Sequence, residues 1–123
     1  MKYFDGSTTA TTNYHYNEAN QLYHSSRGGL DWYYTFDDNG NLTDDDTEGS
    51  DLRDFTWNDD NRLTYVDNIA DDYEVEYTYD AMGRRIMRKD VNNNTYTCYY
   101  YDGLIVIAER KKIGAGSWSY SCY

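Results

Sequence analysis

The chain has 123 residues, a length that suits one domain. Its 22 acidic residues against 11 basic ones give a formal net charge of −11, so nucleic acid and anionic membranes are poor partners. The chain has 16 Tyr, 3 Trp and 3 Phe residues, few aliphatic ones and no proline. This composition excludes a large aliphatic core and suits continuous strands held by aromatic side chains.

One motif recurs five times along the chain. It is an aromatic residue, any residue, a second aromatic residue and Asp or Asn, with Gly or Asn three positions later in all but the shortened last copy. The copies begin at Tyr14, Tyr34, Phe55, Tyr77 and Tyr99, in steps of 20, 21, 22 and 22 residues. Such a period is typical of stacked repeats, in which one unit cannot bury its apolar face alone.

Each repeat reads as a strand, a tight turn, a second strand and a looser turn. Residues 1–13 precede the first complete copy and predict an N-terminal half-repeat or strand. Residues 30–36 and 73–79 alternate strictly, which indicates strands with one aromatic face. Tight turns are predicted at 37–40 and 58–61, a second strand at 62–66, and looser turns at 27–29, 44–51, 67–72 and 91–94. The C-terminal segment 111–123 contains a further alternation at 118–122, which predicts a last strand.

The segment Tyr77 to Arg84, Tyr-x-Tyr-Asp-x-x-Gly-Arg, resembles the signature of YD repeats, also called RHS repeats. Residues 99–109 are similar to the end of a YD array, where the turn shortens to Asp-Gly. The resemblance covers roughly residues 12–110 and assigns five YD repeats to 14–110. It implies an all-β fold, a strip of antiparallel strands in a solenoid-like or shell-like stack of hairpins. In large family members such a strip spirals into a hollow shell around another polypeptide.

The repeat predicts two sets of structural residues. An aromatic ladder of stacked rings would line one face, formed by Tyr14, Tyr16, Tyr34, Phe36, Phe55, Trp57, Tyr77, Tyr79, Tyr99 and Tyr101. In the turns, Asp bonds to its own backbone and Gly accepts a positive φ. These turn residues are Asp37, Gly40, Asp80, Gly83, Asp102 and Gly103.

A calcium-binding loop is a weak candidate in the acidic stretch. Asp44, Asp46 and Glu48 place oxygen ligands on alternate residues, as in the first half of such a loop. The acid expected at the twelfth position is replaced by Phe55, so the match fails there. We expect a solvated acidic turn, and a loose Ca²⁺ site formed by Asp44, Asp46, Glu48 and Asp51 stays open. No other cofactor is expected.

Catalytic residues are sparse. His15 and His24 are the only histidines, and no Gly-x-Ser-x-Gly or Cys/His signature is present. The carboxylates are expected in turns or on outward strand positions. The sequence therefore predicts a protein that is not an enzyme.

Cys98 and Cys122 are the only cysteines. A disulfide between them would fix the last strand and would suit an exported protein. Two free thiols and an intermolecular bond are the alternatives.

The expected function is structural. The chain would build an extracellular or cell-surface wall, either within a larger RHS shell or by joining copies of itself head to tail through its terminal strands. A carbohydrate-binding adhesion module, with Tyr33 and Tyr100 stacking on sugars, is one alternative, and a fragment of a toxin-encapsulating shell is another. No signal peptide is recognisable, and the longest apolar run, residues 104–108, is too short to span a bilayer.

Overall fold

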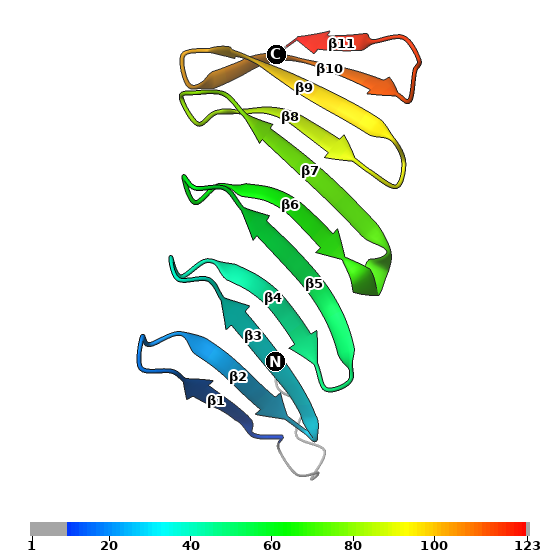
Figure 1. The fold of residues 1–123 in the computed structure, drawn as a ribbon. Coiled ribbons are helices and arrows are strands. Elements are labelled where there is room, and N and C mark those ends of the chain that lie inside the picture. The colour runs from blue at the N-terminus through cyan, green and yellow to red at the C-terminus, as the bar shows by residue number, and fades with distance from the viewer. Residues whose placement is uncertain (1–9, 123) are drawn as a thin grey trace, which may run out of the picture.

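The computed structural model describes residues 10–122, which form a single open sheet (Figure 1). Each strand pairs antiparallel with the next one along the chain, from β1 at one edge to β11 at the other. The elements are β1 (Thr12–Tyr16), β2 (Leu22–Arg27), β3 (Leu30–Phe36), β4 (Leu42–Thr47), β5 (Ser50–Trp57), β6 (Leu63–Asn68), the short 3-10 helix η1 (Ile69–Asp71), β7 (Tyr73–Tyr79), β8 (Arg85–Asp90), β9 (Thr95–Asp102), β10 (Ile105–Ile113) and β11 (Ser119–Cys122). The expected all-β antiparallel strip is confirmed.

Four tight turns, at residues 17–21, 37–41, 58–62 and 80–84, share one backbone geometry. In each turn the N–H of the first residue donates to the fifth carbonyl and the N–H of the fourth donates to the first carbonyl, at 2.9–3.0 Å. The fourth residue has a positive φ, which Gly and Asn tolerate best: Asn20 +60°, Gly40 +84°, Asn61 +59° and Gly83 +81°. All four turns lie along one side of the strip (Figure 1).

Each hairpin carries a β-bulge just beyond its turn. The register shifts opposite the second aromatic residue of the motif, so one residue of the following strand has no direct partner. These residues are Tyr23, Thr43, Thr64 and Ile86. A bulge increases the local right-handed twist. Its repetition adds to the ordinary twist of the sheet, and the strands rotate progressively along the strip (Figure 1).

The register divides the side chains between two faces, because directly opposite residues of antiparallel strands point the same way. We call the face that carries Phe55, Tyr77 and Tyr99 the aromatic face, and the opposite face, with Asp44, Glu76 and Lys89, the polar face. All ten predicted ladder residues lie on the aromatic face. Within the described residues no second layer covers either face, so a side chain is buried only by its neighbours on the same face.

The buried side chains are few. Val75, 2% exposed, is the one buried apolar side chain of the described residues. Ser25, Asp45 and Thr97 are the buried polar ones, and all three lie on the aromatic face. The described sheet therefore has no hydrophobic core enclosed between two layers.

The ladder is not a stack of rings, contrary to the sequence-based expectation. Successive motif copies occupy every second strand, about 10 Å apart at the usual strand spacing, which is too far for ring contact. The strand between them supplies other groups, as Arg85 does at 5.2 Å from both the Tyr77 and the Tyr99 ring. Within residues 10–122 the ring–ring contacts join only His15, Tyr23, His24 and Tyr33.

The predicted loose turn at 44–51 is wrong. β4 continues to Thr47 and β5 begins at Ser50, so only Glu48 and Gly49 connect them. The pairing of β4 with strands on both sides overrides the low strand propensity of Asp. The predicted turn at 67–72 is shorter, because β6 runs to Asn68 before η1.

The predictions for the two terminal segments, 1–13 and 111–123, can be compared with the structure only in part. Of the N-terminal segment 1–13, residues 1–9 lie outside the described residues, and β1 begins at Thr12. At the other end β10 runs across position 110, and β11 covers all but the first residue of the alternation at 118–122. No helix in the described range is long and apolar enough to cross a membrane.

Candidate functional site

The repeats are joined by hydrogen bonds from the second aromatic residue of the motif. Trp57 Nε1 donates to the Leu42 carbonyl at 2.7 Å, and the Tyr79 hydroxyl donates to the Leu63 carbonyl at 2.6 Å. The Tyr101 hydroxyl donates to the carbonyl of Arg85 in the same way. Each acceptor is the first residue of a second strand in the preceding repeat. The aromatic residues thus connect repeats through their polar atoms as well as their rings.

The tight turns also contact one another. Two of the turns donate from their fifth residue to the next turn. Asn41 Nδ2 donates to Asn61 Oδ1 at 2.9 Å, and Arg84 Nη1 donates to the carbonyl of Gly103 in the shortened last turn at 2.7 Å. A Cβ built at Gly83 would overlap the guanidinium of Arg62. Gly83 is therefore favoured by a close approach as well as by its φ.

As predicted, the turn aspartates accept hydrogen bonds from backbone N–H groups of their own turns. Asp80 Oδ1 accepts from the N–H groups of Met82 and Arg84, both at 2.9 Å, and Asp37 Oδ1 accepts from Asn39 and Asn41 at 2.9 and 2.8 Å. The side-chain amide of Asn41, which donates to Asp37 Oδ2 at 3.0 Å, and then its backbone N–H lower the pKa of Asp37. The backbone N–H of Arg84 is the main cause that lowers the pKa of Asp80. In the shortened last turn, Gly103 has a φ of +60° and Asp102 ends β9.

The aromatic face contains a buried acid that sequence reasoning missed. Asp45, 4% exposed, forms an ion pair with Arg53, whose Nε lies 3.2 and 3.0 Å from the two carboxylate oxygens. The Arg53 guanidinium also lies 5.8 Å from the Phe55 ring. Alignment of the repeats would have placed Asp45 on the aromatic face, because it follows Phe36 by nine residues, just as Ser25 follows Tyr16 and Val66 follows Trp57.

The polar face carries two carboxylate rows. One runs directly across four strands through Asp44, Asp54, Asp67 and Glu74, and the other joins Asp46 of β4 to Asp51 of β5. Directly opposed like charges destabilise a sheet. Burial and then the carboxylate of Asp46 raise the pKa of Asp44 to about 6, and burial raises the pKa of Asp67.

The four residues considered from the sequence for a calcium site are spread over two strands and the connection between them. Asp44 and Asp46 lie on β4, Asp51 lies on β5, and Glu48 belongs to the connection between them. No group of three or more His, Cys, Asp or Glu residues between positions 10 and 122 is arranged to hold a metal ion. One oxygen of Asp44 and one of Asp46 are buried without a hydrogen-bond partner.

The other end of the polar face is a cation–aromatic cluster, formed by Lys89, Tyr96, Tyr100, Arg110, Lys112 and Trp118. The Arg110 guanidinium lies 4.1 Å and the Lys112 ammonium 4.8 Å from the Trp118 ring. Lys112 also lies 5.0 Å from the Tyr96 ring. Lys89 is paired with Glu76 at 3.1 Å, where the cluster meets the acidic half of the face.

The two tyrosines proposed for sugar contact lie far apart. Tyr33 on β3 is 44% exposed and stacks on His24 at 4.9 Å, which in turn stacks on His15 at 4.9 Å. Tyr100 on β9 is 41% exposed and lies 5.8 Å from Arg110. Six strand spacings separate them, about 29 Å, so they share a face without forming one site.

The cysteines have free thiols, which was one of the alternatives left open by the sequence. Cys98 on β9 lies opposite Arg110, and Cys122 on β11 lies opposite Ala108, so β10 separates their strands. At two strand spacings their Cα atoms are too far apart for a disulfide without backbone movement.

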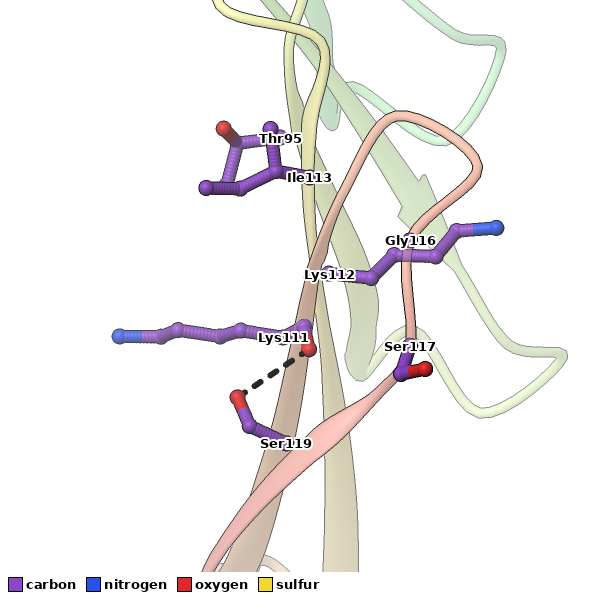
Figure 2. Close-up of a pocket in the computed structure, with 7 residues that line it drawn as sticks. All are labelled: Thr95, Lys111, Lys112, Ile113, Gly116, Ser117 and Ser119. Carbon is purple, nitrogen blue, oxygen red and sulfur yellow. Dashed lines mark hydrogen bonds between the residues drawn. The ribbon is translucent and has the colours of Figure 1, made fainter.

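A hollow of about 340 Å³ lies beside the loop between β10 and β11. Figure 2 shows Lys111 and Lys112 pointing to opposite sides and Ser119 Oγ donating to the Lys111 carbonyl, at 3.3 Å. The lining residues are Thr95, Lys111, Lys112, Ile113, Gly116, Ser117 and Ser119. They include no acid, histidine or cysteine that could act as a base or thiolate there.

The edge strands are the most exposed elements. All four residues of β11 and four of the five residues of β1 are exposed, and each strand pairs on one side only within the described sheet. Neither strand contains the Lys or Pro that commonly blocks edge pairing. Tyr14 and Tyr16 on β1 are 58% and 57% exposed, and Tyr120 on β11 is 66% exposed.

Comparison with known proteins gives a likeness of fold. No protein-family model matches the chain, and no curated protein matches its sequence. The chain is similar to a solved structure, the crystal structure of TcdB2-TccC3, with a TM-score of 0.69 and 18% sequence identity. The likeness covers 87% of this chain and 6% of that chain. It supports a YD-repeat-like fold, an antiparallel β-strip that also occurs within a much longer protein.

Proposed function

We propose that this chain is a non-enzymatic structural protein, a segment of an extracellular β-sheet wall that gains further strands at its edges. The added strands belong either to the remaining sheet of a larger shell or to other copies of the chain. The exposed edges β1 and β11 carry the proposal, because an unprotected edge presents a row of backbone donors and acceptors to a new strand. The likeness to a small part of a much longer chain supports the shell form.

The distribution of charge supports joining between copies. Residues 84–122 contain seven Lys or Arg and three Asp or Glu, whereas residues 10–83 contain three and eighteen. One end of the strip is therefore basic and the rest is acidic. Complementary ends of this kind favour encounter between the tail of one copy and the body of the next.

Negative-stain electron microscopy across a concentration series tests the self-joining form. We expect filaments that lengthen with concentration in the wild type and none in a Tyr14→Lys, Ser121→Lys variant, because Lys on an edge strand opposes pairing. The matched control is Asn39→Lys, Ala81→Lys, which adds the same charge in two exposed turns. Equal filaments in the edge variant would contradict the proposal, and dispersed wild-type particles throughout would refute self-joining.

Carbohydrate binding is the second candidate, favoured by the exposure of Tyr33 and Tyr100 on one face. The two rings would contact sugar units about 29 Å apart on one chain or on separate chains. Glycan-array binding that is lost in Tyr33→Ala and Tyr100→Ala variants, with assembly unchanged, would support an adhesion module. Array signals equal to those of the wild type would remove this candidate.

A further inference from the structure

The polar face has an acidic half and a basic half, and most of its charged side chains form no ion pair within the described part of the chain. No ion pair within residues 10–122 joins Asp44, Asp46, Asp51, Asp54 or Asp67 to a cation. On the other half, Arg110 and Lys112 contact aromatic rings but no carboxylate, and Arg110 Nε is buried without a hydrogen-bond partner. Each half thus presents the charge that the other half lacks.

The order of the strands would let two copies satisfy both halves together. The acids occupy β4 to β7, and the cation–aromatic cluster occupies β8 to β10 and the loop before β11. A two-fold axis parallel to the strands, placed between β7 and β8, reverses the strand order of the second copy. It puts β10 above β5, and the reverse contact follows by symmetry. The axis leaves positions along the strands unchanged, so Lys112, which the register places level with Thr56, lies two residues along from Asp54.

The flat area of the polar face is close to that of a standard interface. The eight strands β4 to β11 span about 34 Å across the sheet and, at about six residues per strand, about 20 Å along it, or about 700 Å² of flat area. A standard specific interface buries about 800 Å² per partner. Two twisted sheets pack face to face with their strands about 30° apart, a geometry open to this strip.

We propose that two copies of this chain associate through their polar faces, with the carboxylate rows of each copy covering the cation–aromatic cluster of the other. The partner is a second copy because the two halves are complementary on the same face. Relief of the like-charge contacts in the carboxylate rows would contribute to the association. This contact is independent of edge pairing and would give the proposed wall a second layer.

Charge reversal of one half at a time tests the arrangement. One variant carries Arg110→Glu and Lys112→Glu, which replaces two cations of the cluster by acids, and the other carries Asp51→Lys and Asp54→Lys. Both are made in the Tyr14→Lys, Ser121→Lys background, so that edge pairing does not contribute. Sedimentation equilibrium at about 0.1 M salt, where the Debye length is about 10 Å, measures the dissociation constant.

We expect a dimer from the edge-blocked parent and a dissociation constant at least about tenfold higher for either reversed variant alone, equivalent to about 1.4 kcal/mol. An equimolar mixture of the two variants should restore a dimer that contains one copy of each. A third variant, Asp38→Lys and Asp59→Lys, makes the same charge change in exposed turns and should dimerise at least as well as the parent.

Two results would overturn the inference: an edge-blocked parent that stays monomeric, or reversed variants that do not associate when mixed. The mixture is decisive because salt alone is ambiguous. Salt screens the face-to-face attraction and also the repulsion between two strongly acidic chains, since the wild-type charge of −11 becomes −9 with the two added lysines. Replacement of Arg110 and Lys112 by Gln provides a milder variant if circular dichroism shows that the double Glu variant is unfolded. A dimer without filaments in the unblocked wild type would remove self-joining at the edges and leave this contact intact.

Discussion

Gly83 and Gly40 occupy the same position in two turns of the same geometry, which makes them a matched pair for measuring contact between turns. Their φ angles are +81° and +84°. An alanine at either site would adopt the left-handed region at a cost of about 1–2 kcal/mol. A Cβ at Gly40 would lie 3.5 Å from Gln21 Nε2, which is ordinary contact, whereas a Cβ at Gly83 would overlap the Arg62 guanidinium.

We therefore expect Gly40→Ala to lower the free energy of unfolding by about 1–2 kcal/mol, and Gly83→Ala by about 1 kcal/mol more. The extra cost is limited because the overlapping group is the end of a flexible side chain and can move aside. Urea unfolding followed by far-UV circular dichroism measures both values, and unchanged m-values would show that the comparison is valid.

The double-mutant cycle with Arg62→Ala isolates the contact. In that background Gly83→Ala should cost no more than Gly40→Ala, so the coupling energy should be about 1 kcal/mol. Equal losses for the two glycines in the wild-type background would refute the reasoning, because they would mean that Arg62 does not contact the next turn. An extra cost at Gly83 that persists without Arg62 would refute it as well.

Three further predictions follow from other contacts. The raised pKa of Asp44, about 6 against 3.8, makes a stabilising contribution that is fully present below pH 3.8 and is lost as the pH rises through 6. Asp44→Asn should therefore make unfolding free energy less dependent on pH across that window, and an unchanged pH profile in urea unfolding would contradict the assignment. Tyr79→Phe removes the hydroxyl that donates to the Leu63 carbonyl and should cost about 1 kcal/mol in the same assay, whereas Tyr33→Phe, with no such bond, serves as the control. Arg85→Ala removes the guanidinium between Tyr77 and Tyr99 and should cost about 1 kcal/mol, whereas no change would mean that the rings hold the sheet without it.

The repeated hairpins could be predicted from the sequence because their signals are local. The alternation in residues 30–36 and 73–79 coincides with β3 and β7, and the Asp, Gly and Asn positions mark the tight turns. The strand character of 44–47 was not predictable from composition. Three consecutive aspartates have low strand propensity, and only the neighbouring strands and the ion pair of Asp45 with Arg53 hold them in β4.

Which side chains lie next to one another on each face was harder to predict from the sequence than the positions of the strands. Which side chain lies between two motif rings depends on the register across a hairpin, and the bulge shifts that register by one residue. For this reason Arg85, rather than Ile86, lies opposite Tyr79. The carboxylate rows likewise arise from residues on four different strands, which no local pattern brings together.

The direction of the two edge strands has a consequence for how a wall could grow. Because each strand is antiparallel to the next, β1 and β11 run the same way. If one copy is placed beside another by translation, β11 meets β1 as a parallel pair, and the resulting polymer has two distinct ends. An antiparallel junction with continuous faces instead requires a half-turn about the sheet normal, which joins β1 to β1 or β11 to β11. The polymer then has no direction and alternates between two kinds of junction, which can be opened separately by a substitution on one edge strand.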